Sequence, residues 1–581
     1  MLAPRRSTLP LVAVHICFLI SSQLTLFAAA APTDPHRDYA GSMTVTRFGI
    51  VATSQTLASQ AGTAVLERGG SAVDAAIAAN AALGVIEPMM DGIGGDLFAI
   101  VYEAKTGTIT GINASGWAPK ATSIAYLRAH GITGNILPAR SVQTVTVPGA
   151  VAGWSALHHR FGKLPLNDDL APAIYLAKNG FPVSEMNAQS WAAFGRVVAK
   201  EPGFANVFLP GGKAPVEGEV FENPDLARTL ERVANQGADG FYRGPVAAAI
   251  VDFLNSLGNP MSKEDLSEFS PEWVQAISTT YHGWTVFELP PNGQGIAALE
   301  MLNIMEQFPL KDYGHNSASA LHAMIEAKKL AYADLRRYVA DPRFSEVPVS
   351  EMSSKSFAAG RAKLLTNTAG CQVTPADLAA TLQNAGRDTT YLSVVDRDGN
   401  IVSLIQSNSG AFGTGLVAPG TGFVLQNRGA GFSLDANHPD ALAARKRPFH
   451  TIIPGLMRKG DVTVGFGIMG GLNQPQAHAQ FVSNMVDFGM NLQAALDAAR
   501  FTKLTFDGCD VSIESRVPET VITELRSKGH QIRIEDAYSQ MMGRGNAVMV
   551  DSHGMKYGAS DPRADGQAAP EQPPYWDAGH R

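Results

Sequence analysis

The sequence predicts an α+β protein in which stacked β-sheets lie between two layers of helices. Helical patterns dominate the chain up to about residue 345, whereas short apolar segments separated by Gly, Pro, Asn and Asp dominate after residue 389. The 581 residues are 45% hydrophobic, which is enough for a large buried core. No repeat or sharp change of composition marks a domain border, so both halves are expected to share one structure.

The elements predicted in the first half follow from apolar periodicity and from glycine stops. Leu57–Arg68 has helical spacing and ends at a glycine pair, and Ala72–Leu83 is almost free of charge, so it must be buried to be stable. The predicted strands are Gly49–Thr53 and Leu97–Tyr102, and the remaining predicted helices are Leu226–Gln236, Val246–Leu257, Ile296–Gln307 and Ala318–Arg337.

The second half reads as a series of strands followed by helices. Predicted strands are Asp388–Asp396, Ile401–Ile405, Gly422–Leu425, Thr451–Met457 and Val462–Phe466, and predicted helices are Pro475–Phe488 and Leu492–Ala499. The tail from Ala564 is rich in Pro, Gln and Ala and is expected to be loose.

The amino terminus has the order of a secretory signal peptide. Arg5 and Arg6 precede an apolar run over 9–27, and small residues from Ala28 to Ala31 follow. We therefore expect residues 1–31 to be removed and the protein to be secreted or periplasmic. A single membrane anchor is the alternative, although polar residues such as His15 interrupt the run.

Charge and cysteine content narrow the range of partners. The net charge is −7, the isoelectric point is about 6.1, and no long basic run occurs, so neither nucleic acid nor an anionic membrane is an expected partner. No metal-binding signature is present, and neither a metal nor another cofactor is expected. Cys371 and Cys509 remain in the mature chain, where a bridge and two unpaired buried thiols are both compatible with the sequence.

The strand that begins at Thr389 carries a specific chemical hypothesis. If the peptide bond between Asp388 and Thr389 is cut, Thr389 gains a free α-amine within reach of its own hydroxyl. One residue then holds both a nucleophile and a general base, because an α-amine has a pKa near ~8. An edge strand with a polar first residue is the simpler interpretation of this stretch alone.

Several further motifs, which follow one another along the chain, favour the hypothesis of a cut before Thr389 over an ordinary edge strand. They are Val147–Gly153, Glu326–Asp334, the Thr389 strand, Phe412–Gly415, Lys446–Pro448, Gly470–Gly471 and Tyr557–Arg563. Together they resemble the γ-glutamyltranspeptidase family of N-terminal nucleophile hydrolases, over nearly all of the chain from about Gly49 to Arg563. The resemblance implies a precursor that cuts itself between Asp388 and Thr389. Its large subunit (32–388) and small subunit (389–581) would form a heterodimer folded as a four-layer αββα sandwich.

The resemblance also implies the catalytic roles. Thr389 would attack an amide carbonyl, with its α-amine taking the proton. Backbone N–H groups of Gly470 and Gly471 would stabilise the oxyanion, because glycine lets the substrate approach the main chain. Ser407 stands where the family has a second hydroxyl that supports the nucleophile, although that residue is usually threonine.

Departures from the family pattern concern specificity. Ser115 replaces the arginine that holds the substrate α-carboxylate in typical members, and Ala430 and Gly431 replace the acidic pair that holds the α-amine. Loss of these charge-assisted contacts makes glutathione a doubtful substrate. The connection from Leu434 to Arg445 lacks an obvious lid, which predicts a more open site.

Three other side chains are candidates to replace the missing anchors. Arg428 would bind a carboxylate from a new direction, or would be an ordinary solvated arginine. His450 and Thr451 stand where the family usually has two serines near the oxyanion site, and His450 is either a pocket residue or a packed core histidine.

The chain looks most like the oxamate amidohydrolase and cephalosporin-acylase-like branch of the family. We expect a self-cleaving threonine amidohydrolase that hydrolyses a small acyl amide or peptide bearing a carboxylate. A γ-glutamyltransferase or glutathione hydrolase with rearranged anchors is the first alternative. A relative that binds a ligand without catalysis is the second.

Overall fold

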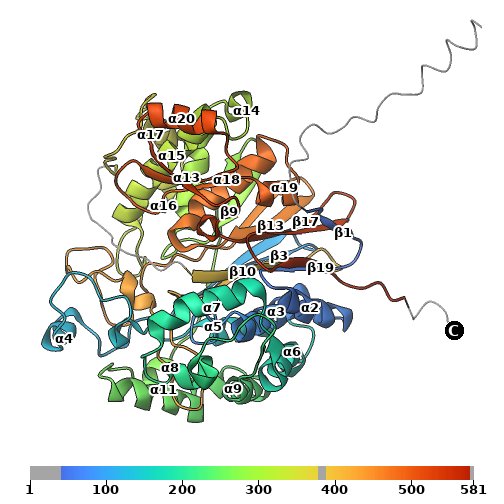
Figure 1. The fold of residues 1–581 in the computed structure, drawn as a ribbon, viewed down its shortest axis with the longest axis vertical. Coiled ribbons are helices and arrows are strands. Elements are labelled where there is room, and N and C mark those ends of the chain that lie inside the picture. Colours follow the sequence, from blue (N-terminus) through green and yellow to red (C-terminus); the bar gives the residue numbers. More distant parts are fainter. Residues whose placement is uncertain (1–40, 377–387, 576–581) are drawn as a thin grey trace, which may run out of the picture. The chain divides into compact units, whose positions relative to one another are not determined.

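Two seven-stranded antiparallel sheets form the centre of the molecule, as shown by a computed structural model that describes residues 41–376 and 388–575 (Figure 1). One of them contains the strand of Thr389 and is here called the nucleophile sheet, after the nucleophile expected from the sequence. Its order is β19 (Gln567–Pro570), β2 (Ile50–Thr53), β10 (Asp388–Val395), β11 (Ile401–Ser409), β3 (Asp96–Glu103), β4 (Thr108–Ala114) and β7 (Glu272–Val274).

The second sheet stacks on the nucleophile sheet. Its order is β1 (Thr44–Thr46), β18 (Lys556–Ser560), β17 (Gly545–Val550), β13 (Val462–Ile468), β12 (Gly455–Lys459), β9 (Trp284–Glu288) and β8 (Ile277–Tyr281). Side chains of the two sheets meet between them: Asn546 Nδ2 donates to the Tyr391 carbonyl at 3.0 Å, and Ser403 Oγ donates to the Phe466 carbonyl at 3.4 Å. Each sheet is built from segments on both sides of the Asp388–Thr389 bond.

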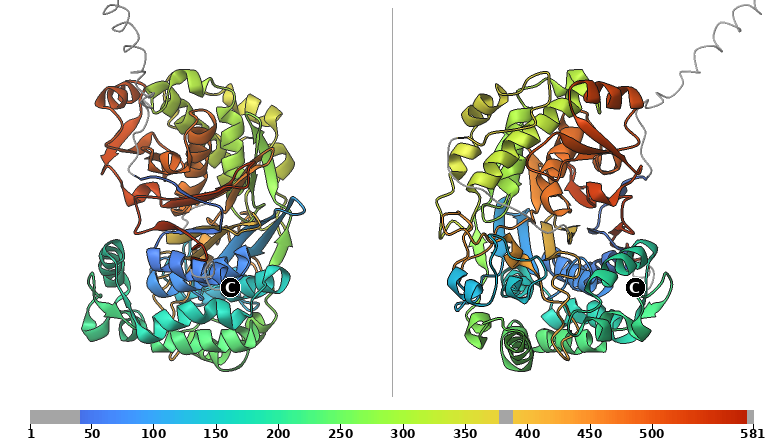
Figure 2. Two further views of the ribbon diagram at one scale, coloured as in Figure 1. Left: turned by 90° about the vertical axis from the view of Figure 1, so that its right-hand side faces the viewer. Right: turned by 60° about the vertical axis from the view of Figure 1, so that its left-hand side comes forward.

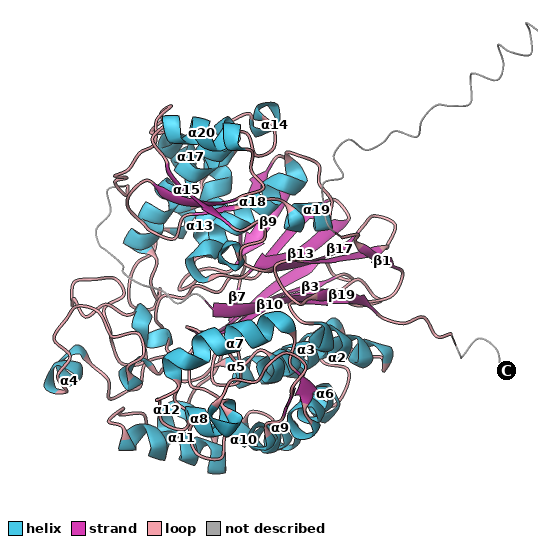
Figure 3. Ribbon diagram, viewed as in Figure 1, coloured by secondary structure: helices cyan, strands magenta, loops and turns pink. Residues whose placement is uncertain are grey.

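Helices cover the outer face of each sheet, and Figures 2 and 3 show the same order of layers from other directions and by secondary structure. The layer over the nucleophile sheet contains α2 (Thr56–Glu67), α3 (Ala72–Ile86), α5 (Ala150–Phe161), α6 (Leu166–Asn179), α7 (Glu185–Val198), α9 (Pro224–Gln236) and α11 (Gly244–Ser256). The layer over the second sheet contains α13 (Gly295–Met305), α15 (Ala318–Tyr338), α17 (Lys355–Ala362), α18 (Gln474–Val486), α19 (Leu492–Asp497) and α20 (Glu519–Ser527). The predicted α+β class and the four-layer αββα arrangement are confirmed.

Local sequence explains why the buried helix α3 forms where it does. Ser71 caps its first turn, and Asp74 completes a capping box by accepting from the Ser71 backbone N–H at 2.8 Å. Its alanine-rich surface is buried between the nucleophile sheet and α6, which is the burial that its lack of charge predicted.

Short elements complete the chain. They are α4 (Ile124–Ala129), α8 (Phe204–Phe208), α10 (Asp239–Tyr242), α12 (Lys263–Ser267), α14 (Leu310–Tyr313), α16 (Val349–Met352), a two-stranded sheet of β5 (Phe181–Pro182) and β6 (Val220–Phe221), and a three-stranded sheet of β14 (Phe501–Thr502), β15 (Asp510–Glu514) and β16 (Gln531–Glu535).

The structure corrects three predictions. Residues 422–425 form no strand, and the strand predicted from Thr451 begins only at Gly455. The tail predicted to be loose contains β19, which pairs with β2. Strands β7 to β9, within a region predicted to be helical, were not foreseen.

One prediction falls on a segment outside the described residues, namely the proposed signal peptide over 1–31. Among the residues that the structure describes, no helix is both long enough and apolar enough to cross a bilayer.

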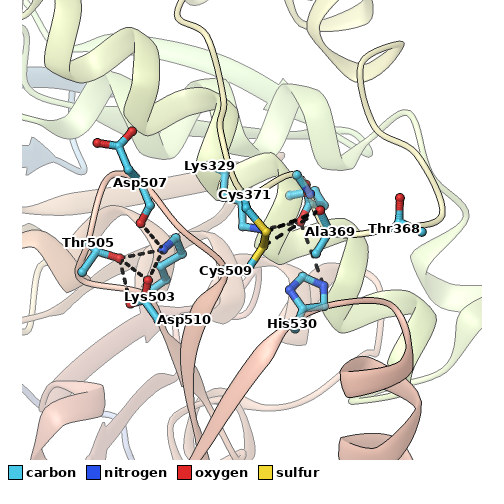
Figure 4. Close-up of a disulfide and its surroundings, with 12 residues drawn as sticks. Lys329, Thr368, Ala369, Cys371, Lys503, Thr505, Asp507, Cys509, Asp510 and His530 are labelled. Carbon is cyan, nitrogen blue, oxygen red and sulfur yellow. Dashed lines mark hydrogen bonds and ion pairs between the residues drawn. A yellow bond between two sulfur atoms is a disulfide. The ribbon is translucent and has the colours of Figure 1, made fainter.

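Cys371 and Cys509 form a disulfide (Figure 4). The bridge resolves the choice that the sequence left open between paired and free cysteines. It joins residues on opposite sides of the Asp388–Thr389 bond, with the Lys329 ammonium 3.9 Å from the Cys509 sulfur.

Candidate active site

Thr389 lies at a bulge between β10 and β11. Asp388 pairs with Ser409, but Thr390 pairs with Gln406, so β11 has one extra residue opposite Thr389. Such a bulge changes the direction of nearby side chains. Ser409 has a φ of 78°, an uncommon conformation for a residue with a side chain, and its N–H points to the Ser407 hydroxyl at 2.8 Å.

The Ser407 hydroxyl is the centre of the site. It donates to the carbonyl oxygen of Asp388 at 2.6 Å, which is the carbonyl of the Asp388–Thr389 bond itself. The Thr389 hydroxyl donates to Ser407 Oγ at 3.2 Å. Both hydroxyls are buried, with exposures of 1% for Thr389 and 0% for Ser407. Before any cut, therefore, Ser407 polarises the carbonyl beside the threonine.

Arg428 is a buried cation beside these hydroxyls. Its Nη2 donates to Ser407 Oγ at 3.0 Å and its Nη1 donates to Thr451 Oγ1 at 2.9 Å. Burial lowers the pKa of Arg428 to about 10, and the charge of Asp96 opposes that shift, so Arg428 stays protonated at neutral pH. Among the described residues its Nε finds no hydrogen-bond partner and its guanidinium makes no ion pair. The interpretation of Arg428 as a solvated arginine is wrong, because it is only 2% exposed.

Asp96 and His450 form a buried pair behind Arg428. His450 Nε2 lies 3.1 Å from Asp96 Oδ2, and the Ile452 N–H points to His450 Nδ1 at 3.3 Å. Burial, with the charges of Arg428 and Arg447, lowers the pKa of His450 to about 4. His450 is thus neutral at pH 7, with its proton on Nε2.

Asp96 is fixed by donors from three separate segments. Its Oδ1 accepts from the N–H groups of Gly116 at 2.9 Å and Gly149 at 3.2 Å, and from Gln426 Nε2 at 2.8 Å. Asp96 also lies directly opposite Ser407 in the pairing of β3 with β11. A Cβ at Gly95 would lie 2.3 Å from the Ser407 carbonyl oxygen, which explains the glycine before this aspartate.

The Gly470–Gly471 turn is tied to the same cluster. Both glycines have positive φ, 137° and 60°, and they precede helix α18. Gln294 Nε2 donates to the carbonyls of Gly471 at 2.7 Å and Thr451 at 2.6 Å. The turn is therefore held beside the residue whose hydroxyl contacts Arg428.

Comparison with known proteins agrees with this geometry. The family model described as gamma-glutamyltranspeptidase matches residues 58–571. The chain belongs to the γ-glutamyltranspeptidase family.

Individual relatives include both glutathione hydrolases and other acylases. A glutathione hydrolase-like YwrD proenzyme of Bacillus subtilis is 36% identical over 89% of this chain and 98% of that protein. An oxamate amidohydrolase proenzyme of Klebsiella pneumoniae is 35% identical over 91% and 99%. The crystal structure of cephalosporin acylase from Bacillus halodurans matches with a TM-score of 0.85 and 41% identity, covering 93% of this chain and 99% of that one. The chain is thus an enzyme of the amidohydrolase and acylase type.

In this γ-glutamyltranspeptidase family member, the structure brings together most of the residues singled out in the sequence. Thr389, Ser407, Arg428 and Thr451 form one hydrogen-bonded cluster. Ser115 is connected to His450 through Asn292. The Ser115 hydroxyl accepts from Asn292 Nδ2 at 3.1 Å, and the Asn292 carbonyl accepts from the His450 N–H at 2.9 Å.

Sequence reasoning missed Asp96, Asn292, Gln294 and Gln426. Asp96 follows a glycine turn at the start of an apolar strand, and Asn292 and Gln294 lie in a Pro- and Gly-rich segment. No motif indicated that Gln426 would donate to Asp96, or that Gln294 would join the Thr451 and Gly471 carbonyls.

Proposed function

We propose that this protein is a self-cleaving threonine amidohydrolase, secreted or periplasmic, that hydrolyses a small acyl amide bearing a carboxylate. In this proposal residues 1–31 are a signal peptide, residues 32–388 form the large subunit and residues 389–581 form the small subunit. Thr389 forms the acyl-enzyme. No cofactor or metal takes part in the proposed steps.

The buried guanidinium of Arg428, which makes no ion pair to a described residue, is the observation that supports a carboxylate-bearing substrate. A buried charge is costly unless a counter-ion or hydrogen bonds compensate it. Arg428 has two neutral hydroxyl partners, an unpartnered Nε and no ion pair to a described residue. The charge of Asp96 acts on Arg428 without a direct ion pair. A substrate carboxylate would give the guanidinium a directly bonded anion and would fix the acyl group beside Thr389.

The self-cleavage step follows from the contacts of Ser407. Thr389 Oγ forms a bond to the Asp388 carbonyl carbon, the C–N bond breaks, and the released nitrogen takes the proton. The hydrogen bond from Ser407 to that carbonyl stabilises the developing oxyanion, and Arg428 keeps the Ser407 hydroxyl polarised. The α-amine of Thr389 is then free, and water hydrolyses the ester, which releases Asp388 with a new α-carboxylate and restores the Thr389 hydroxyl.

Turnover would repeat the same chemistry on an external amide. The free α-amine takes the proton from Thr389 Oγ as it attacks, and the leaving amine receives that proton. The N–H groups of the Gly470–Gly471 turn would face the oxyanion of the substrate. Water completes hydrolysis, and an amine that replaced water would give acyl transfer instead.

The decisive experiment has two parts. In amino-terminal sequencing, the first residue of the smaller fragment is expected to be Thr389, whereas Thr389→Ala should remain one uncut chain.

Purified wild type is then assayed on oxamate, on glutaryl amides and on a γ-glutamyl anilide. We expect the carboxylate-bearing acyl amides to be preferred, and strong turnover of the γ-glutamyl anilide alone would instead establish a γ-glutamyl hydrolase or transferase. A chain that is never cut would contradict both and favour a non-catalytic binding protein.

A further inference from the structure

Two histidines and a glutamate form a buried cluster next to the disulfide, and the proposed reaction uses none of them. His322 and Glu326 lie one turn apart on α15, so their side chains leave the same face of that helix. His530 lies in the connection between α20 and β16 (Figure 4). The ligand atoms of these three side chains all lie within 4.8 Å of one another, and all three residues are buried.

The hydrogen bonds of His322 decide which of its nitrogens can bind a metal. Its Nε2 lies 2.8 Å from the Thr366 carbonyl oxygen, which can only accept. A neutral His322 therefore carries its proton on Nε2 and has a lone pair on Nδ1. That Nδ1 faces His530 Nε2 at 2.8 Å, so the two rings direct nitrogens at one point. A carbonyl that fixes the outer nitrogen of a ligand histidine is a common feature of protein metal sites.

His530 can offer its Nε2 to a metal by a change of tautomer. Without a metal its Nε2 donates to His322 Nδ1, and its own Nδ1 has no hydrogen-bond partner among the described residues. With a metal the proton moves to Nδ1, and the Nε2 lone pair faces the ion. Neither neutral ring has to lose a proton to become a ligand.

Glu326 offers a third ligand atom, which is shared with a lysine. Its Oε2 accepts from the Gly370 N–H at 3.1 Å, which fixes the carboxylate. Its Oε1 accepts from Lys329 Nζ at 2.6 Å and lies 4.0 Å from His530 Nε2. Both side chains of the ion pair are buried, with exposures of 7% for Glu326 and 1% for Lys329. The Lys329 ammonium therefore competes with a metal for Oε1.

A cavity of about 440 Å³ lies beside the cluster. Its lining includes His322, Thr366 and Lys528. The cavity gives an ion a path to the cluster and leaves space for a water molecule as a fourth ligand, both of which such a metal site needs.

We propose that His322, Glu326 and His530 bind one Zn²⁺ ion, with water as the fourth ligand, and that this ion joins the two subunits. Imidazole and carboxylate ligands in a four-coordinate site suit Zn²⁺. The sequence gave no metal signature because His530 comes from a segment far from the helix that carries the other two ligands.

The place of the ligands in the chain explains the joining role. His322 and Glu326 belong to the proposed large subunit, and His530 belongs to the proposed small subunit. The ion would therefore cross the same division as the bridge between Cys371 and Cys509. The joining role rests on the proposed cut, whereas the binding of Zn²⁺ does not.

The test is a titration of the purified enzyme with Zn²⁺, on a chain without a polyhistidine tag that a chelator has stripped of metal. We expect one Zn²⁺ per heterodimer by elemental analysis. X-ray absorption should show nitrogen and oxygen ligands at about 2.0–2.2 Å, with imidazole rings and no sulfur. At 100 times its Kd, Zn²⁺ should raise the Tm by at least about 2 °C, because the ion binds the folded protein.

Single substitutions locate the ion. His322→Gln, Glu326→Gln and His530→Gln each remove one ligand and should weaken Zn²⁺ binding by at least about 10-fold. Lys329→Met removes the competing ammonium and should tighten binding by about 10-fold or more. His553→Gln is the matched control, because His553 is an exposed histidine outside the cluster and its loss should leave the affinity unchanged. Circular dichroism checks the fold of each metal-free variant, and X-ray absorption on the wild type reports the ligands without any substitution.

The joining role is measured in the cut Cys371→Ser variant, where no disulfide links the subunits. Zn²⁺ should raise the urea concentration at which the two subunits separate. Adding His530→Gln to this variant should abolish that rise, whereas adding His553→Gln should not.

The outcomes separate this inference from the proposed function. Less than one Zn²⁺ per heterodimer at saturation, sulfur among the ligands, or equal affinity in wild type and His530→Gln would overturn the metal site and leave the proposed function intact. An ion that binds at the cluster without changing the separation of the subunits would overturn the joining role. A chain that binds Zn²⁺ through these ligands but is never cut would keep the metal site and overturn the proposed function.

Discussion

At the scale of single residues, Arg428 is a buried cation that donates to the hydroxyls of Ser407 and Thr451 in the candidate site. Replacing it with Met removes the donors to Ser407 and Thr451 together with the positive charge. Hydrogen bonds to charged groups contribute about 1.5–3 kcal/mol, so we expect kcat/KM for a carboxylate-bearing amide to fall by at least about 10-fold. Self-cleavage should also slow, as followed by the rate of fragment appearance on a denaturing gel.

A lysine at this position is the matched control for the Arg428 prediction. It keeps the charge but cannot bridge both hydroxyls in the way that a planar guanidinium does. Arg428→Lys should therefore retain part of the preference for acidic over neutral acyl amides. Equal loss of both substrate types in the Met and Lys variants would show that Arg428 is needed for structure rather than for carboxylate binding.

His450 predicts a pH dependence of stability. Its pKa is about 4 in the folded protein, because it is buried and faces Arg428 and Arg447, and about 6.5 when unfolded. Between these values the unfolded chain binds a proton that the folded protein does not, so the free energy of unfolding falls as pH falls, by up to ~1.4 kcal/mol per pH unit. His450→Gln should lose this contribution. The Tm difference between the two proteins, measured from pH 8 to pH 4, should be constant above pH 7 and should shift in favour of the variant below pH 6.5.

Two parallel Tm curves over that range would contradict a neutral, buried His450. The other histidines whose pKa is lowered, His315, His438 and His530, are present in both proteins and cancel in the difference.

Candidate site residues could be selected from the sequence where a motif fixed their spacing. Thr389, Ser407 and Thr451 belong to this group, although Ser407 and Thr451 depart from the usual residue type, and the structure places all three in one cluster with Arg428. Asp96 could not be predicted, since its place opposite Ser407 depends on the register of β3 against β11, and register leaves no local mark in the sequence.

At the scale of elements, the C-terminal strand β19 is an unexpected part of the nucleophile sheet. Its composition predicted a loose tail, yet Gln567–Pro570 pairs with β2, and Glu571 accepts from the Gly49 N–H at 2.9 Å. Long-range pairing overrode weak strand propensity here, because Ala568 and Ala569 are small enough to be covered on the sheet. At 422–425 the prediction failed in the other direction. A strand was expected from the apolar residues, and the structure has none there.

Deleting residues 567–581 should therefore destabilise the enzyme. The deletion leaves β2 as an uncovered edge, so we expect a Tm lower by at least about 2 °C and a greater tendency to aggregate. Gln567→Ala is the control, because that side chain is exposed and the backbone pairing remains. Thermal unfolding followed by circular dichroism, with light scattering, measures both effects, and an unchanged Tm in the deletion would show that β19 adds nothing to the sheet.

At the scale of the whole molecule, the proposed cut would separate two chains that share both sheets. In the nucleophile sheet, β10 from the proposed small subunit lies between β2 from the large subunit and β11, and β11 in turn pairs with β3 from the large subunit. Neither fragment can keep a complete sheet alone, so cleavage should not release them. The disulfide adds a covalent link across the same division.

That link predicts how the cut enzyme behaves with and without reductant. On a denaturing gel the two fragments should run as one band without reductant and as two bands with it, whereas Cys371→Ser should give two bands in both. Under native conditions the Cys371→Ser fragments should still elute together, because the interleaved strands hold them.

Unfolding of the bridged enzyme involves one covalent unit, but unfolding of the reduced or substituted enzyme releases two chains. The Tm of the reduced enzyme should therefore rise with protein concentration, and the Tm of the bridged enzyme should not. A concentration-independent Tm in the cut Cys371→Ser variant would contradict the view that the sheets, and not only the disulfide, join the two subunits.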